Sequence, residues 1–275
     1  LDARVPQVKF VDRTFNCNPR RTVELLNWIQ KHDNGVTNFH FEIAADITTE
    51  EELTIMEQMR PGLIQLEIGV QSTNPKTVEA IHRTMDLTKL AEVVSRVKGF
   101  GNIHQHLDLI AGLPYENLES FQKSFDDVYG MQPDQLQLGF LKVLKGSGMK
   151  EDADGYEIRY HEHAPYEVLT TRWLNYGEVL TLKGVEEMVE VYYNSRQFDR
   201  TIAHIMEQYD SPYRFFLELA EYYDRKGLSG IGHSRIARYE ILRAFLEEKK
   251  LGGPDNDQCM VLDLYARENL KSRPA

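Results

Sequence analysis

Short apolar segments alternate with helical patterns along the first 150 residues of this 275-residue chain. Each segment is rich in β-branched or aromatic residues and is typical of a strand. Strands that alternate with helices predict a parallel sheet, because a crossover between parallel strands needs a connection of about helix length. The predicted strands are VKFVDRTF (8–15), FHFEIAAD (39–46), LIQLEIGVQS (63–72), HLDLIAGLP (106–114) and LQLGFLKVLKG (136–146).

Helix-start signals support the same alternation. Asn18 precedes Pro19 and Asn74 precedes Pro75, so each pair combines a preferred N-cap residue with proline at the first helical position. Thr48 is predicted as the cap of the next acidic helix start. The predicted helices of this half span 19–32, 48–59, 74–85, 87–100 and 117–131.

The third strand decides between two parallel-sheet architectures. Leu66, Ile68 and Val70 fall on one face, whereas Glu67 and Gln71 fall on the other. An open doubly wound sheet needs two apolar faces, but the inner face of a barrel or half-barrel can line a site. A strand at the edge of a sheet can have one solvent-exposed polar face, but this explains one strand with alternating polar residues and not several in succession. We therefore predict a partial (β/α) barrel of about five βα units. The other polar residues predicted on the less apolar side of the strands are Asp12, Thr14, His40, Glu42, Asp46, Asp108 and Gln137.

The second half of the chain has a different pattern. Residues 1–150 form the predicted barrel, 151–175 a linker or lid, and 176–275 an all-helical domain. Dense aromatic residues at helical spacing predict the core of that domain. These aromatics are Tyr192, Tyr193, Phe198, Tyr213, Phe215, Phe216, Tyr222 and Tyr223. Breaks between its helices are expected at 194–195, 210–212, 227–232 and 252–254.

Composition excludes several classes of protein. The net charge is -11, which argues against a general nucleic-acid or anionic-membrane surface. No apolar run approaches the roughly 20 residues that a membrane span requires. Two cysteines fit a reducing compartment and rule out a disulfide framework. We therefore expect a soluble, cytoplasmic protein that acts on a small molecule, without nucleic-acid or membrane partners.

Taken together, the five strand segments resemble a known family. In their order and spacing, VKFVDRTFN, FHFEIAAD, LEIGVQSTNP, DLIAGLPYEN and LQLGFLKVLKG look like strands two to six of the radical S-adenosylmethionine enzymes. The chain is most similar to those members that carry an N-terminal cobalamin-binding domain and a C-terminal helical domain of unknown function. Residues 163–195 resemble the start of that helical domain.

The resemblance implies a cofactor site at the carboxyl ends of the strands. Members of the family reduce S-adenosylmethionine at a 4Fe–4S cluster and release a 5′-deoxyadenosyl radical. By position, Asp12, Arg13 and Thr14 would lie near the amino acid moiety of the cofactor, although the family's Gly-Gly-Glu is replaced here. Glu42, Glu67 and Gln71 would face its ribose and methionine groups.

The last two strands carry the remaining residues that the resemblance implies. The family motif GxIxGxxE is half present, since Ile110 and Gly112 match while Asp108 replaces the first glycine. Tyr115 stands at the glutamate position, and Glu116 follows one residue later. Leu141, Lys142 and Val143 would offer backbone groups to adenine.

The largest departure from the family is the missing cluster loop. No CxxxCxxC occurs, and Cys17 and Cys259 cannot supply three thiolate ligands, so no metal site is expected in this chain. The first strand and a cobalamin domain are also missing. We expect a piece of a longer enzyme that begins just after the cluster loop and is inactive alone. The 4Fe–4S cluster, and cobalamin where it is used, would then belong to the full-length protein.

Other interpretations stay open from the sequence. A cluster-free, non-catalytic scaffold that binds a protein partner is one of them. A barrel lyase with a Schiff base on Lys142 or Lys145 is another, although it requires eight strands. A barrel without its first strand would also leave an unpaired edge, so we expect the chain to dimerise through that edge, to borrow a strand, or to be protected there by its C-terminal helices.

Overall fold

The computed structural model describes residues 2–267, and the chain divides into two compact units, 1–175 and 176–275. Five parallel strands form the sheet of the first unit in the order β1-β2-β3-β4-β5. The strands are β1 (Gln7–Lys9), β2 (Asn38–Ile43), β3 (Ile64–Gln71), β4 (His104–Ala111) and β5 (Gln135–Phe140). Each strand therefore lies beside its successor in the chain, as in a barrel and unlike the reversed order of a doubly wound sheet.

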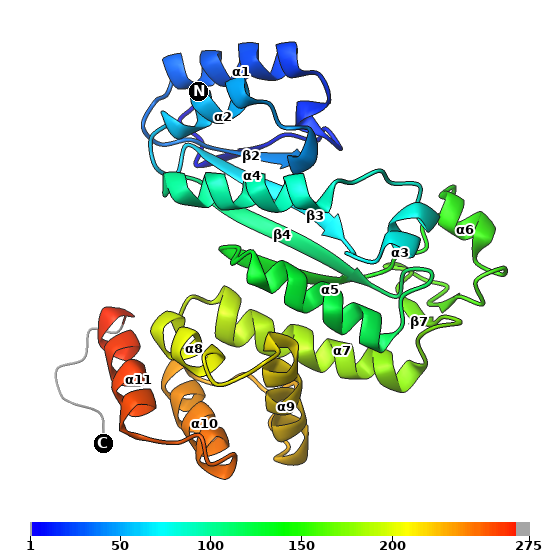
Figure 1. The fold of residues 1–275 in the computed structure, drawn as a ribbon, viewed down its shortest axis with the longest axis vertical. Coiled ribbons are helices and arrows are strands. Elements are labelled where there is room, and N and C mark those ends of the chain that lie inside the picture. Colours follow the sequence, from blue (N-terminus) through cyan, green and yellow to red (C-terminus); the bar gives the residue numbers. More distant parts are fainter. Residues whose placement is uncertain (1, 268–275) are drawn as a thin grey trace. The chain divides into compact units, whose positions relative to one another are not determined.

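Helices connect the strands and cover one face of the sheet. They are α1 (Pro19–Lys31), α2 (Glu50–Glu57), α3 (Pro75–Ala80), α4 (Leu87–Phe100) and α5 (Leu118–Gly130). Figure 1 shows α4 and α5 running alongside β3 and β4. Strand residues of the apolar set, such as Phe41, Leu66 and Leu107, are fully buried. Because parallel crossovers share one hand, consecutive units wind the same way, and this confirms the predicted partial (β/α) barrel.

Most predicted helix starts are confirmed. Asn18 and Asn74 cap α1 and α3, with their side chains accepting hydrogen bonds from backbone N–H groups of the first turn. The predicted cap Thr48 is wrong by one residue, because Thr49 and Glu52 form a reciprocal capping box at the start of α2.

The first strand is shorter than the sequence predicts. Only Gln7–Lys9 pairs with β2, as its edge strand, and a 3-10 turn follows at Phe15–Cys17. Phe10 and Phe15 both pack on Phe41, with ring centroids 4.9 and 4.0 Å from it. These contacts draw the chain over the helix-covered side of the sheet and end the strand early, which period-2 alternation alone cannot predict.

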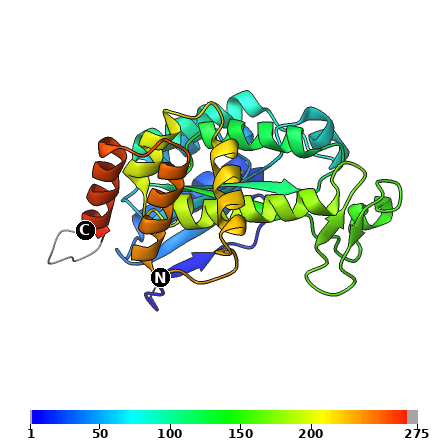
Figure 2. The same ribbon diagram turned by 90° about the horizontal axis from the view of Figure 1, so that it is seen from below.

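Residues 141–175 complete the first unit instead of forming a separate linker. They contain α6 (Gly148–Asp152) and a small antiparallel pair, β6 (Arg159–Tyr160) and β7 (Val168–Thr170). Figures 1 and 2 both show this green segment at the end of the sheet toward which β3 and β4 point.

The second unit is helical, as predicted. Its helices are α7 (Tyr176–Val189), continued by a π turn at Glu190–Asn194, and α8 (Asp199–Met206), α9 (Pro212–Arg225), α10 (Arg235–Glu248) and α11 (Pro254–Arg267). Seven of the eight predicted core aromatics are buried, and Tyr193 is half-buried. Within residues 2–267 no helix combines the length and apolarity that crossing a membrane demands.

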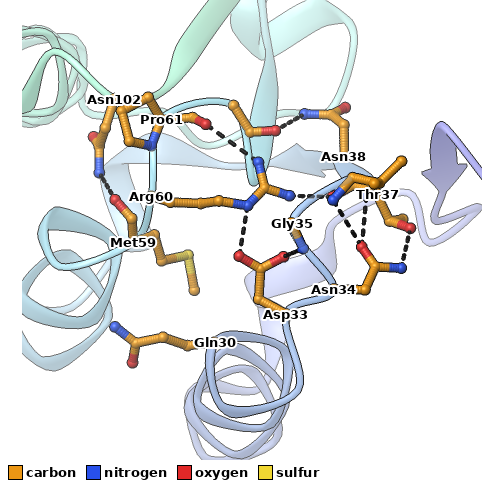
Figure 3. Close-up of polar contacts among 12 residues, drawn as sticks. Gln30, Asp33, Asn34, Gly35, Thr37, Asn38, Met59, Arg60, Pro61 and Asn102 are labelled. Carbon is orange, nitrogen blue, oxygen red and sulfur yellow. Dashed lines mark hydrogen bonds and ion pairs between the residues drawn. The ribbon is translucent and has the colours of Figure 1, made fainter. Parts of the chain in front are cut away.

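A polar clasp joins the loops at the amino ends of the strands (Figure 3). Arg60 Nε donates to Asp33 Oδ2 at 2.5 Å, while its Nη2 donates to Thr37 O at 2.9 Å and its Nη1 to Pro61 O at 3.2 Å. Burial opposes ionisation of Asp33, but the hydrogen bonds from Arg60 and Gly35 outweigh it and lower the pKa of this carboxyl. One guanidinium therefore ties together the connections before β2 and before β3.

Replacing this guanidinium tests the clasp. We expect Arg60→Met to lower the free energy of unfolding by about 2 kcal/mol at pH 7, since it leaves a mostly buried carboxylate without its cation. Arg20→Met is the matched control, because Arg20 pairs with Glu24 on the exposed face of α1 and should contribute less than about 0.5 kcal/mol. Urea unfolding of both variants measures the difference, and equal losses would contradict a structural role for the clasp.

Candidate functional site

Polar side chains gather on the face of the sheet opposite α1, α2, α4 and α5. In the strand register, Glu42 lies beside Glu67, and Glu67 beside His106. One step along, Asp108 lies beside Gln137. The predicted inward residues thus share one face, and we call Glu42, Glu67, Gln71, His106 and Asp108 the polar face.

Glu67 is an ion-pair centre of the polar face. Its Oε2 accepts hydrogen bonds from Lys9 Nζ at 2.8 Å and from His40 Nε2 at 2.7 Å. Burial would raise the pKa of Glu67, but these two partners prevail and hold it below the ordinary value. No sequence motif marked Lys9, because its proximity to Glu67 depends on the register of β1 against β2.

Glu42 has the opposite environment. Its carboxylate makes no hydrogen bond within residues 2–267. Burial raises its pKa, and the neighbouring carboxylates of Glu67 and Asp108 raise it further. The positive charges of Lys9 and Arg83 lower the pKa of Glu42 but do not cancel this rise, so a further cation would stabilise the ionised carboxylate.

Three buried polar atoms of the polar face lack hydrogen-bond partners in the described part of the chain. They are Gln71 Oε1, His106 Nε2 and Asp108 Oδ1. His106 Nε2 does lie 2.9 Å from Asp108 Oδ1, which is an ion-pair distance, but the angles do not make a hydrogen bond. Because buried polar groups are nearly always satisfied, such a cluster indicates a place for a polar ligand.

A glycine makes room for two of the side chains at this place. A Cβ on Gly69 would lie 2.4 Å from Gln71 Nε2 and 3.5 Å from an Arg83 guanidinium nitrogen. The side chains of Gln71 and Arg83 therefore extend over Gly69 on the polar face. Arg83 follows α3 in the chain, and no sequence motif marked it.

The carboxyl end of β4 is closed by a close contact. Gly112 has φ 88°, and a Cβ there would come within 2.8 Å of Val168 Cγ1. Leu141 N donates to Ala111 O, Val168 N to Leu141 O, and Val143 N to Tyr166 O, each at 2.9 Å. Ile110 lies beside Gly139 on the polar side of this end.

Two further groups of predicted residues lie after strands. Backbone groups of Leu141 and Val143 already bond within the protein, and Lys142 bridges to Glu167, so binding of adenine by this stretch stays a prediction. Asp12, Arg13 and Thr14 lie in the loop after β1, outside any strand. Asp12 accepts a hydrogen bond from Arg21 Nη1 at 3.3 Å.

A buried carboxyl lies beside the polar face, between the loops that follow β3 and β4. Glu116 Oε1 accepts hydrogen bonds from Ser72 Oγ at 2.6 Å and from Ser124 Oγ at 2.9 Å. All three residues are inaccessible to solvent or nearly so. Burial raises the pKa of Glu116 to about 7, and the two hydroxyl donors only partly offset it.

This raised pKa predicts a pH dependence of stability. The unfolded chain ionises Glu116 near its ordinary pKa of 4.5, but the folded chain only near 7, so folding loses stability as the pH rises between these values. Glu116→Gln removes the titration. Relative to the wild type, this variant should gain about 2 to 3 kcal/mol in unfolding free energy between pH 5 and pH 8. Urea unfolding at both pH values measures this gain, and a difference that does not change with pH would contradict it.

The described residues offer no group of three or more His, Cys, Asp or Glu side chains that could hold a metal ion. Cys17 and Cys259 are free thiols, Cys17 exposed and Cys259 half-buried. Two cysteines cannot supply the three thiolates that bind such a 4Fe–4S cluster.

Comparison with known families and sequences gives partial matches. A family described as "Protein of unknown function (DUF4080)" matches residues 154–275. The oxygen-independent coproporphyrinogen III oxidase of Salmonella typhimurium is 30% identical over 107 residues, which cover 37% of this chain and 23% of that protein. A related protein of Bacillus subtilis, the oxidase-like HemZ, is 29% identical over 119 residues, covering 42% and 23%. The chain thus spans about a quarter of the length of these relatives.

Solved structures with a similar fold belong to radical S-adenosylmethionine enzymes. The methyltransferase TsrM of Kitasatospora setae, whose structure contains cobalamin and a [4Fe-4S] cluster, aligns with a TM-score of 0.50 at 13% identity, over 60% of this chain and 35% of that one. Coproporphyrinogen III oxidase (HemN) of Escherichia coli aligns at 0.48 and 18% identity, over 65% and 39%. The first of these similarities shows a shared fold.

Proposed function

We propose that the first unit binds S-adenosylmethionine on its polar face, as part of a radical S-adenosylmethionine enzyme that is longer than this chain. The observation that carries the proposal is the buried acceptor Gln71 Oε1, which has no hydrogen-bond partner, beside the carboxylates of Glu42 and Asp108. Asp108 Oδ1 has His106 Nε2 at 2.9 Å but no hydrogen bond. Sequence similarity to oxygen-independent coproporphyrinogen III oxidases and fold similarity to TsrM support it.

The chemistry of these acceptors fits the cofactor. S-adenosylmethionine carries a sulfonium, an ammonium group and ribose hydroxyls, so it offers positive charge and several hydrogen-bond donors. Carboxylates accept strong charge-assisted hydrogen bonds from such groups. Glu42 gains a cation in addition to Lys9 and Arg83, Gln71 Oε1 gains a hydrogen-bond donor, and Asp108 gains a donor besides the nearby His106.

Glu67 takes a different part in this proposal. Lys9 and His40 both bond to its Oε2, so much of its hydrogen-bonding capacity is used before any ligand arrives. We therefore assign Glu67 to holding the edge strand β1 and the buried His40 in place, and Asp108 to the cofactor.

The rest of the enzyme would have to supply the redox chemistry. When bound to a reduced iron–sulfur cluster, S-adenosylmethionine provides a 5′-deoxyadenosyl radical. This chain has no thiolate set for a cluster, so its own residues would bind and orient the cofactor. Cobalamin use by the whole protein stays a prediction from the family resemblance, and the substrate is not assigned.

Binding of S-adenosylmethionine to this chain, measured by isothermal titration calorimetry, tests the proposal. Asp108→Asn should weaken binding about tenfold or more, since a hydrogen bond to a charged group contributes roughly 1.5–3 kcal/mol. Glu67→Gln should weaken it less than about threefold, because the carboxylate mainly serves Lys9 and His40.

Glu57→Gln serves as the control for loss of a carboxylate, because Glu57 is exposed at the end of α2. It should bind the cofactor as the wild type does. No binding by the wild type at millimolar cofactor, or full affinity in Asp108→Asn, would overturn the assignment of the polar face. A larger loss of affinity in Glu67→Gln than in Asp108→Asn would mean that Glu67, and not Asp108, is the main contact of the cofactor.

A further inference from the structure

The end of β3 is irregular at the residue that reaches the polar face. The register between β3 and β4 is regular up to Gly69 and Asp108, then shifts so that Gln71 lies beside Leu109. Gln71 has φ 68°, and Ser72 N donates to Val70 O at 2.9 Å across it. A positive φ is uncommon outside glycine, and such bends and bulges re-aim side chains near functional sites.

This bend determines where the Gln71 side chain lies. Its Nε2 is above Gly69, at 2.4 Å from the position that a Cβ would occupy, and its Oε1 is buried without a donor. If β3 continued straight through Gln71, the turn that directs the Gln71 side-chain amide back over Gly69 would be lost. Gln71 can therefore serve the site only while the turn after β3 persists.

Hydrogen bonds to one helix and one loop hold that turn. Ser72 Oγ donates to Glu116 Oε1 and accepts from Asn74 N at 3.0 Å. Thr73 N donates to Ser124 Oγ at 3.1 Å, and Ser124 Oγ donates to the same Glu116 oxygen. Both serines thus meet at Oε1 of a carboxyl with no solvent exposure.

We propose that Glu116 is a positioning residue of the cofactor site, which fixes the turn at Ser72 and so keeps the Gln71 amide over Gly69. The inference rests on the proposed function for its link to S-adenosylmethionine, but the placement of Gln71 can be tested without it. Glu116 itself does not touch the polar face through any hydrogen bond, since its bonds go to Ser72 and Ser124.

The hydrogen bonds explain which substitutions should matter. An amide oxygen accepts from two hydroxyls as a carboxyl does, so Glu116→Gln keeps both bonds. Glu116→Leu keeps the volume but leaves two buried hydroxyls without an acceptor. Ser72→Ala removes the bond between the turn and Glu116 together with the bond from Asn74 N, but leaves Ser124 bonded to Glu116, and gives a milder variant if Glu116→Leu fails to fold.

NMR measures the environment of the Gln71 side-chain amide directly, and calorimetry measures the affinity for S-adenosylmethionine. The side-chain amide signals of Gln71, assigned by their loss in Gln71→Glu, should shift in Glu116→Leu and Ser72→Ala. Affinity for S-adenosylmethionine should fall about three- to tenfold in both, as loss of about one hydrogen bond to Gln71 predicts. Glu116→Gln, which keeps both hydrogen bonds, should leave the Gln71 signals and the affinity for S-adenosylmethionine close to those of the wild type.

Glu52→Leu is the matched control, because Glu52 is equally buried but caps α2. It should lower the melting temperature without moving the Gln71 signals. Unmoved Gln71 signals in folded Glu116→Leu, or in Ser72→Ala, would overturn the positioning role. Shifted signals without any cofactor binding by the wild type would keep the positioning role and reject the proposed function instead. Equal shifts in Glu52→Leu would mean that Glu116 acts only through overall stability.

Discussion

The two faces of the parallel sheet differ because its strands follow one another in sequence order. Successive right-handed crossovers bring the helices back to the same side, where apolar residues such as Leu66 and Leu107 are fully buried. The opposite face receives no connecting helix of the first unit, so it need not be apolar. This asymmetry gives Glu42, Glu67 and Asp108 a common surface on which a polar ligand can bind.

Sequence alone predicted the features that depend on local pattern. Period-2 alternation assigned Glu67 and Gln71 to the polar face, and the Asn-Pro pairs located the starts of α1 and α3. Features that depend on contacts across the fold were missed. The early end of β1 follows from the packing of Phe10 and Phe15 on Phe41, and the partners of Glu67 follow from strand register. Likewise, the bonds of Glu116 join residues 44 positions apart.

Two glutamates of the first unit show how environment outweighs residue type. Glu67 is partly buried, yet the ammonium of Lys9 and the ring of His40 hold its pKa low. Glu116 is fully buried with only hydroxyl donors, and burial holds its pKa near neutrality. A cation is thus the feature that separates a permanently charged group from one that can carry a proton at physiological pH. No reading of the local sequence distinguishes them.

The contact between Gly112 and Val168 has a consequence for how a ligand reaches the sheet. Residues 166–168 bond to 141–143, and the Val168 side chain rests against Gly112, where no other residue type would leave room for it. The segment of 151–175 that the sequence suggested as a lid is therefore anchored at this point to the strand end it would have to uncover. A hinged flap must release such contacts each time it opens, whereas an anchored wall leaves the access route unchanged. The segment would then form a fixed wall at this end of the sheet instead of a flap that opens and closes.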